Sequence, residues 1–551
     1  MNLNKKNLVL TAFTLIIIGI TAWRALQPTA ADAGKSGFSA AQAIKDIETI
    51  AKEPHSSENQ QALQKVRAYL CSRFESMGLK PTVNTYTANN WLGSYAVNNI
   101  TAQIDGRNNH PYVLVMAHYD SVLEDLYGER SESTGAVDDG YGVAVLLQIA
   151  EYFSKTEKQP VNGIKFLLTD SEETGPLEGS KAEIGQNTDY YEDVSLIINI
   201  EARGANGPAM MFHTSGGNSR VIELYSKANS PFSNSLMTGL FRFMPNITDL
   251  NPFLEHGYPG LDFAALGHLK YYHSGYDRIE AIDVDTLSHY GEQIFPLMKE
   301  YVYQDAYSDS NYFKTGKNAV FFSLPPNIFI YYYDAVNSFL FIITILLLFF
   351  IIIKGRRKGT LFLKVCIRYG LKWLMFTLIA AISALILTVF LAFLTDSAYN
   401  PIFMISIPYD NAIFIVYILL VLAGAVIWTF RCRRNTDSLP EMLIGGLQLN
   451  LIYYILFTLF LKGGSYLFLL PSLFASAAIA LLMHGKSIAV KPVLLLTLSF
   501  MILIYAPVIY VLYYALTIGS LFLPVILLSA GMSVFAPALL FIIRKQKADC
   551  F

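Results

Sequence analysis

Six side chains of the kinds that bind metal ions or transfer protons occur in order along the first half of the chain. Most of them come shortly after an apolar run, such as YVLVMA, IKFLLT or LIINI. The six residues are His118, Asp138, Glu172, Glu173, Glu201 and His273. Imidazole nitrogens and carboxylate oxygens suit Zn²⁺, and no cysteine competes for a place among them. Side chains at strand ends meet in the crevice above a parallel sheet, so the pattern predicts a metallohydrolase.

Taken one at a time, these residues also have ordinary structural explanations. A lone histidine near an aspartate is usually a polar pair, and adjacent glutamates are mostly solvated. Asp138 and Asp139 could simply cap the helix that follows them. His256 and His268 compete with His273 for the last position in the set. It is the ordered combination that predicts a metal site.

The elements that must position these residues follow from the alternation of apolar runs and amphipathic segments. Two amphipathic helices are expected within residues 38–80, with Gly78 as a C-cap. Further on we expect strands at 112–117, 163–169 and 195–200 and helices at 141–154 and 218–228. This order predicts an α/β domain with a mostly parallel central sheet flanked by helices. Asp138 then lies just before a helix N-terminus, which favours its ionised form.

The composition changes sharply near Asp334, beyond which long apolar runs dominate. Each run is close to the ~20 residues that cross a bilayer. They cover 335–353, 372–394, 411–430, 442–461, 465–483, 492–516 and 520–543. The predicted domains are an N-terminal transmembrane helix at 1–30, a domain with the predicted metal site at 36–310, a juxtamembrane linker at 311–334 and a membrane domain of about seven helices at 335–551. For the membrane domain we expect a scaffold or a platform that presents substrate.

Residues 8–23 form an apolar segment that follows Lys5 and Lys6. An uncleaved anchor and a cleaved signal peptide both fit this pattern. We expect the anchor, and the A-x-A-like sequence near 29–31 is the main argument for cleavage.

Basic residues between the spans predict the orientation of the chain. Four basic groups fall on one side if every segment spans, and they comprise Lys354, Arg356, Arg357, Lys358, Arg431, Arg433, Arg434, Lys486, Lys491, Arg544, Lys545 and Lys547. Both termini are then cytoplasmic, and residues 24–334 face outward. A bacterial cell membrane is favoured, while an endomembrane with the domain in its lumen would give the same topology.

Charge and cysteine content narrow the possible partners. The formal net charge of −2 and the lack of a basic stripe predict no nucleic-acid partner. Cys71 is the single cysteine before residue 335, so the outer domain cannot contain an internal disulfide. The apolar runs predict the lipid bilayer as a partner, and the sequence does not indicate an oligomeric state.

The motifs AHYDS, GAVDDGYGVAVLLQIA, LLTDSEETG, NIEARG and YYHSGYD occur in one order over about residues 40–300. In this the chain resembles the co-catalytic zinc aminopeptidases of the aminopeptidase Y type, which are relatives of glutamate carboxypeptidase. The multispan tail is similar to that of vacuolar and endoplasmic-reticulum membrane metallopeptidases. The resemblance implies the zinc-exopeptidase fold and two zinc ions per chain.

The resemblance also assigns a role to each residue. Asp138 would bridge the two ions. Glu173 and His273 would complete one ligand set, and His118 and Glu201 the other. Glu172 would be the general base for a metal-bridging hydroxide. From the residues themselves, a bridging carboxylate suits two ions ~3.5–4 Å apart, and Asp120 is expected to orient the imidazole of His118.

The implied activity is that of an aminopeptidase acting on peptides outside the cytoplasm. A carboxypeptidase, a glutaminyl cyclase or a non-catalytic binding ectodomain on the same fold are the alternatives. Two segments depart from the family pattern: the charged stretch 122–134, and EETGPLEGS, which is one residue longer than usual. The charged stretch is either a solvated loop or a rim that attracts a free amino terminus. Arg203 could bind a substrate carboxylate or carbonyl, or form a structural salt bridge.

Overall fold

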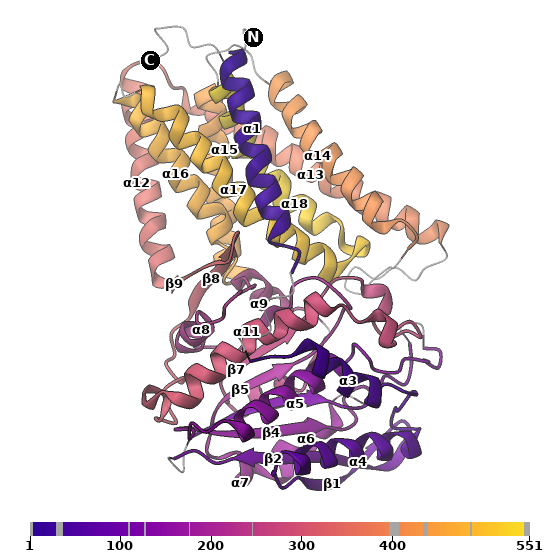
Figure 1. Cartoon of the computed structure of the whole chain (residues 1–551). Helices are drawn as coiled ribbons and strands as arrows, with labels where there is room; N and C mark the ends of the chain where they lie inside the picture. Colours follow the sequence, from indigo (N-terminus) through magenta and orange to yellow (C-terminus); the bar gives the residue numbers. More distant parts are fainter. Residues whose placement is uncertain are drawn as a thin grey trace.

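The structure is a computed structural model of the chain, shown in Figure 1. It describes residues 4–28, 37–107, 111–125, 128–175, 177–244, 246–395, 407–432, 439–484 and 487–544. The A-x-A-like sequence at 29–31 lies outside the described residues. So do the basic residues Arg433, Arg434, Lys486, Lys545 and Lys547.

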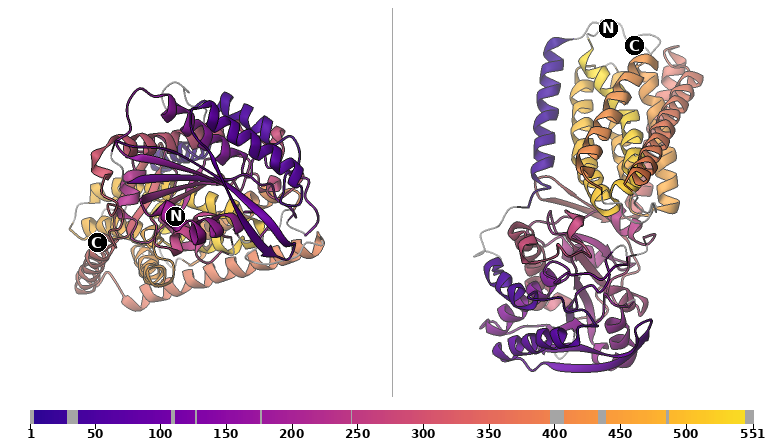
Figure 2. Two further views of the ribbon diagram at one scale, coloured as in Figure 1. Left: turned by 90° about the horizontal axis from the view of Figure 1, so that it is seen from below. Right: turned by 90° about the vertical axis from the view of Figure 1, so that its right-hand side faces the viewer.

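A helical bundle stands on an α/β domain, and the two parts are distinct in both side views (Figures 1 and 2). In the described part of the α/β domain a seven-stranded sheet has the order β1-β2-β4-β3-β5-β7-β6. Its strands are β1 Thr82–Asn90, β2 Gly93–Ile104, β3 Tyr112–His118, β4 Gly163–Thr169, β5 Val194–Ile200, β6 Met210–Thr214 and β7 Gly260–Ala264.

The sheet is mixed. The neighbouring strands β4, β3, β5 and β7 run parallel, as predicted, whereas β1, β2 and β6 pair antiparallel at the two edges. The short connection between β1 and β2 explains one antiparallel pair, because a tight hairpin can join only antiparallel strands. The predicted α/β class is confirmed, with the parallel part confined to the centre.

Every residue of β3, β4 and β5 is buried, so both faces of the central sheet are covered. Alternate residues of β3 belong to different cores. Val113 and Val115 pack into the larger core, and Leu114 and Met116 pack into a smaller one. The larger core contains helices α3 Ala40–Ile50, α4 Gln60–Ser76, α5 Gly140–Lys155, α8 Ser219–Tyr225 and α11 Val284–Tyr303. The smaller core contains α6 Glu178–Gln186, α7 Thr188–Tyr191 and α10 Leu250–Glu255.

The predicted elements have close counterparts, with one clear difference. Gly78 follows α4 with φ +78°, as expected for its role in ending that helix. The helix predicted at 218–228 ends earlier, at Tyr225. The N–H groups of Lys227 and Ala228 bond to carbonyls three residues back, so the chain tightens into a turn there.

The described residues contain eight helices that are long and apolar enough to cross a membrane. They are α1 Lys5–Arg24, α12 Ala335–Arg357, α13 Leu363–Leu394, α14 Asp410–Cys432, α15 Leu439–Phe460, α16 Tyr466–Met483, α17 Ser487–Leu516 and α18 Phe522–Ile543. All eight predicted spans are therefore confirmed as helices. Helix α13 begins well before residue 372, because its first turns carry basic side chains that a helix can extend into the interface.

The two parts of the chain contact each other through several elements. The segment predicted as a linker contains a hairpin of β8 Ala319–Leu324 and β9 Ile328–Tyr333. Phe322 of this hairpin stacks on Tyr466 of α16, with ring centroids 4.5 Å apart. Helix α9, Ser235–Phe241, touches the loop before α16, where the Ser235 hydroxyl donates to the Gly463 carbonyl at 2.6 Å. The bundle thus packs against one side of the α/β domain.

Candidate metal centre

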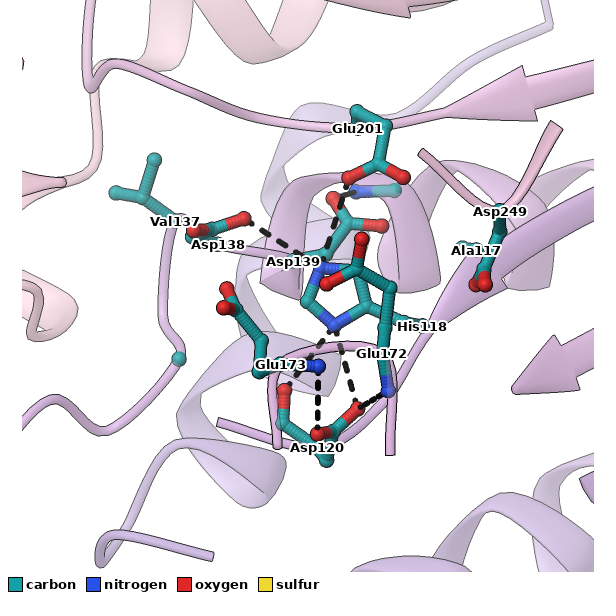
Figure 3. Close-up of polar contacts among 12 residues, drawn as sticks. Ala117, His118, Asp120, Val137, Asp138, Asp139, Glu172, Glu173, Glu201 and Asp249 are labelled. Carbon is teal, nitrogen blue, oxygen red and sulfur yellow. Dashed lines mark hydrogen bonds and ion pairs between the residues drawn. The ribbon is translucent and has the colours of Figure 1, made fainter. Parts of the chain in front are cut away.

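His118, the last residue of β3, has a buried imidazole at the carboxyl end of the parallel strands. Its Nε2 lies 3.4 Å from Asp138 Oδ1 and 3.6 Å from Glu201 Oε2. Asp138 and Glu201 point toward this ring from different elements (Figure 3). Asp138 is in the turn before α5, and Glu201 directly follows β5. The three form one potential ligand set.

A second potential ligand set shares Asp138. His273 Nε2 lies 3.0 Å from Glu173 Oε2 and 3.5 Å from Asp138 Oδ2. One carboxylate oxygen of Asp138 therefore faces each histidine. This is the arrangement required of a carboxylate that bridges two cations.

Several of the candidate ligand atoms lack hydrogen-bond partners that a metal ion would replace. Among the described residues, His118 Nε2, Asp138 Oδ2 and His273 Nε2 are buried atoms without a hydrogen-bond partner. Such groups are costly to bury unless something satisfies them. Within each set the ligand atoms lie within 4.8 Å of one another. Imidazoles and carboxylates in this arrangement suit Zn²⁺, with Co²⁺ or Mn²⁺ as related candidates.

Electrostatic effects at the site reflect the burial of several charges together. Burial and the neighbouring Glu173 raise the pKa of Asp138 to about 6. Burial favours the neutral form of His273, but Glu173 and Asp138 outweigh it and raise the pKa of that imidazole. Like-charged carboxylates held this closely need positive charge between them.

Glu172 lies beside both ligand sets. It forms a third potential group with His118 and Glu173, and its side chain points toward the His118 ring (Figure 3). Burial, followed by repulsion from Glu173, raises the pKa of Glu172 well above its ordinary value. The adjacent glutamates thus both reach the site, Glu172 near His118 and Glu173 at 3.0 Å from His273 Nε2.

Asp120 lies beside the His118 imidazole, which it is predicted to orient. The Nδ1 atom of His118 lies nearer the backbone oxygen of Asp120 (3.1 Å) than its carboxylate (3.6 Å). The carboxylate instead accepts hydrogen bonds from the backbone N–H groups of Glu172, at 3.1 Å, and Glu173, at 3.2 Å. Asp120 therefore ties the end of β3 to the segment that carries both glutamates.

A buried polar chain that the sequence did not reveal holds Glu201. The Asn199 amide donates to Glu201 Oε1 at 3.1 Å and to Asp262 Oδ1 at 3.0 Å. Thr248 donates to the other oxygen of Asp262 at 2.6 Å. Because Asn199 and Asp262 lie on paired strands, the sheet itself fixes the Glu201 carboxylate.

Asp277 holds the turn that carries Asp138, a role that sequence reasoning also missed. Its carboxylate accepts hydrogen bonds from Val137 N–H at 2.7 Å, from Asp138 N–H at 3.3 Å and from the Ser133 hydroxyl at 3.0 Å. Burial and the nearby Asp138 raise the pKa of Asp277 to about 7. The available signal was its position as the last residue of YYHSGYD.

Replacing Asp277 with alanine is expected to lower the metal content and to destabilise the fold. The change leaves the N–H groups of Val137 and Asp138 without an acceptor, at a cost of about 1–3 kcal/mol for a buried group. Thermal unfolding and zinc analysis of the purified protein measure both effects. Asp277→Asn, which keeps one carbonyl acceptor, is the matched control and should retain more of both; equal behaviour of the two variants would contradict this role.

Other candidate residues lie apart from the site. His256 bonds to the Pro252 carbonyl at the end of α10, and His268 lies near Asn206. In the charged stretch 122–134, Arg130 forms ion pairs with Glu58 and Glu124, so these charges interact with one another at the surface. The structure thus brings His273, rather than either rival histidine, to the carboxylates. Despite its unusual length, the EETGPLEGS segment places Glu173 beside His273.

The site opens into a cavity of about 60 Å³. One end is polar and contains His118, Asp138, Glu172, Glu173, Glu201 and Arg203. Apolar side chains also line the cavity, including Phe212, Phe241 and Leu266 from the α/β domain and Ala515 from helix α17 of the bundle. Burial lowers the pKa of Arg203, and its guanidinium lies 5.8 Å from the Tyr272 ring. The polar end suits an ionic or strongly polarised group, and the apolar wall suits a hydrocarbon side chain.

Two imidazoles and three carboxylates around a shared aspartate, at the carboxyl ends of parallel strands, define a candidate two-metal hydrolase centre. Residues 99–298 match the family model described as Peptidase family M28. This match covers the whole metal centre and confirms the resemblance stated from the sequence motifs.

Curated relatives share the same region. A vacuolar membrane protease of Candida tropicalis is 30% identical over 257 residues, which is 44% of this chain and 27% of that protein. Endoplasmic reticulum metallopeptidase 1 of Mus musculus is 27% identical over 247 residues, covering 44% of this chain and 26% of that protein. The chain therefore spans about a quarter of the length of these relatives.

The chain is also similar to solved structures of a glutaminyl cyclase and an aminopeptidase. The glutaminyl cyclase of Porphyromonas gingivalis is 21% identical with a TM-score of 0.40, over 48% of this chain and 99% of that one. The aminopeptidase of Aneurinibacillus sp. strain AM-1 is 14% identical with a TM-score of 0.41, over 50% of this chain and 96% of that one.

Proposed function

We propose that this protein is a membrane-anchored, two-zinc exopeptidase that removes residues from the amino terminus of peptides outside the cytoplasm. The single observation that carries the proposal is the position of Asp138. Its two carboxylate oxygens face His118 at 3.4 Å and His273 at 3.5 Å, and each histidine has a carboxylate of its own nearby. The family match over residues 99–298 supports the same conclusion.

In this proposal Asp138, His118 and Glu201 hold one zinc ion, and Asp138, Glu173 and His273 hold the other. When bound, the ions supply Lewis-acid polarisation of the scissile carbonyl and acidify the attacking water. Glu172 takes a proton from that water and later donates it to the leaving amine. The hydrogen bond from the Glu172 N–H group to the Asp120 carboxylate holds the backbone of Glu172 in place.

The proposed orientation places the peptidase domain outside the cytoplasm. Lys5 and Lys6 begin α1, Arg356 and Arg357 end α12, and Arg544 follows α18. The two chain ends lie at the end of the bundle remote from the α/β domain (Figure 1). Positive charge at that end supports a cytoplasmic location for it.

Hydrolysis of a substrate panel tests this function. The full chain in lipid nanodiscs would be assayed with aminoacyl-p-nitroanilides, amino-terminally blocked peptides and peptides with amino-terminal glutamine. We expect about two zinc ions per chain and release of residues from unblocked substrates alone. Release of carboxyl-terminal residues, or cyclisation of glutamine, would instead establish one of the alternative activities. A folded chain that binds no metal would overturn the proposal.

Removal of the metal is expected to abolish hydrolysis and to lower thermal stability. Without cations the buried carboxylates and imidazoles lack their compensating charge, and a ligand present at 100 times its Kd stabilises a fold by about 2.7 kcal/mol. Dialysis against a chelator, followed by stepwise addition of Zn²⁺, measures both quantities. Activity should return with the added zinc, whereas full activity in the chelated protein would contradict a metal-dependent mechanism.

A further inference from the structure

The last two turns of helix α17, residues 510–516, lie beside three cavities in the described part of the chain. Ala515 lines the cavity of the metal centre. Tyr513 and Tyr514 line a cavity of about 250 Å³ between the α/β domain and the bundle. With Tyr510, the same tyrosines also line a cavity of about 920 Å³ within the bundle. One helix end therefore connects the surroundings of the proposed active site with the membrane part.

The largest of these cavities is an apolar groove between membrane helices, which we call the bundle groove. Its walls come from α1, α14, α17 and α18, and α14 is inclined to α1 in the view of Figure 1. Its residues are Trp23, Leu26, Asn411, Phe414, Ile415, Ile418, Leu419, Leu422, Ala423, Val426, Met501, Ile502, Tyr505, Ala506, Ile509, Tyr510, Tyr513, Tyr514, Leu528, Gly531, Met532 and Phe535. Apart from Asn411, the Trp23 indole and the tyrosine hydroxyls, the side chains of this lining offer only hydrocarbon and thioether contacts.

Polar side chains line the second of these cavities, which shares Asn411, Tyr513 and Tyr514 with the bundle groove. His268 and Lys270 face it from the α/β domain, and Asp410, Asn411 and Thr517 face it from the bundle. The segment that carries His268 and Lys270 also lines the metal-centre cavity, through Leu266 before it and Tyr272 after it. The same two chain segments, 266–272 and 513–517, thus border both cavities.

Along α17 the three cavities differ in their linings: the metal-centre cavity has an apolar contact at Ala515, the cavity at Thr517 is lined by polar side chains, and the bundle groove is apolar. An acyl chain that lay along α17 would form no hydrogen bonds with the polar side chains of the second cavity. A peptide could form them, because its backbone N–H and C=O groups need partners wherever water is excluded. An apolar side chain then suits the wall formed by Phe212, Phe241 and Ala515, and a run of apolar residues suits the bundle groove.

We propose that the substrates are apolar peptides that reach the enzyme from the bilayer. The terminal residue lies at the metal centre, the following backbone crosses the cavity beside Lys270 and Asp410, and the apolar remainder lies in the bundle groove. This inference rests on the proposed exopeptidase function and names its substrate class. It also gives the membrane domain a direct part in substrate binding.

Filling the bundle groove tests this inference with the full chain in liposomes. Ala423→Trp and Ala506→Trp place an indole in the groove from α14 and α17, whereas Ala381→Trp on α13 adds the same group outside it. The substrates are Leu-Gly-Gly and a leucine- and alanine-rich membrane-spanning peptide with a free amino-terminal leucine. We expect the two groove variants to lower kcat/KM for the long peptide about tenfold, a loss equivalent to one good contact, and to leave that for Leu-Gly-Gly unchanged. Equal effects on both substrates, or none on either, would overturn the inference.

A binding measurement separates this inference from the proposed catalysis. The long peptide carries a photoreactive phenylalanine analogue, and the chain carries Glu172→Gln so that the peptide is not consumed. We expect cross-links to α14 and α17 that Ala506→Trp suppresses and Ala381→Trp does not. Labelling by a photoreactive phosphatidylcholine that the peptide fails to displace would assign the groove to lipid and overturn the inference. If the zinc-loaded wild type cleaves neither substrate, the proposed function fails, while cross-linking still reports on the groove.

Discussion

Glu172→Gln is expected to lower kcat by about a thousandfold while two zinc ions remain bound, since general acid–base catalysis contributes about 10²–10⁴-fold. Glutamine keeps the shape of the side chain and the backbone N–H group that donates to Asp120 at 3.1 Å. It cannot accept and return a proton at the pH of the reaction. The loss should therefore appear in kcat far more than in KM.

Zinc content and two comparison variants show whether the lower kcat comes from lost proton transfer or from lost zinc. Glu178→Gln makes the same substitution at the start of α6, outside the metal-centre cavity, and should retain full activity. Glu173→Gln removes a proposed ligand 3.0 Å from His273 Nε2 and should lower the zinc content as well as the rate. If Glu172→Gln also loses zinc, Glu172 is a metal ligand and the proposed general base must be sought elsewhere.

The sequence predicts the centre of the fold well because local pattern and tertiary environment agree there. Strands β3, β4 and β5 are continuous apolar runs and are buried on both faces. The edge strand β1 and its neighbour β2 gave no comparable signal. Strand β1 reads TVNTYTANN and is largely solvent-exposed, so its pairing with β2 depends on the partner strand more than on its own composition.

The candidate ligands were also predictable, because histidines and carboxylates that follow predicted strands indicate a metal site. Asp277 and Asp262 were not, because their roles depend on contacts with residues far away in sequence. Asp277 is hydrogen-bonded to Val137, and Asp262 reaches Glu201 through Asn199. An isolated aspartate in a loop or strand gives no sign of such partners.

The contribution of helix α17 to the metal-centre cavity was equally hidden. The sequence of α17 predicts a membrane span, and nothing in that pattern indicates which soluble residues its end will face. Ala515 approaches the site because the bundle and the α/β domain pack together through α9 and the β8–β9 hairpin. Packing between domains is a property of two complementary surfaces, and a single segment does not encode it.

Changing Asp138 or its neighbour Asp139 to asparagine is expected to have very different effects on zinc content and hydrolysis. Asp138→Asn weakens a ligand shared by both proposed ions, so zinc content should fall below one per chain and hydrolysis should become undetectable. Loss of a supporting residue alone costs about 10–100-fold in metal affinity, and loss of the shared carboxylate should exceed that for each ion. The fold should persist, because the Asp138 N–H group still donates to Asp277.

Asp139→Asn should keep both ions and most of the activity. Asp139 is the N-cap of α5, where its Oδ1 accepts a hydrogen bond from Gly142 N–H at 2.9 Å. Asparagine caps helices about as well as aspartate, whereas Asp139→Ala should cost about 0.5–2 kcal/mol of stability. Zinc analysis, circular dichroism and thermal unfolding of the three variants distinguish the roles. A protein that loses its zinc equally with either asparagine would show that the ligand sets are not centred on Asp138, because only one of the two carboxylates lies between the histidines.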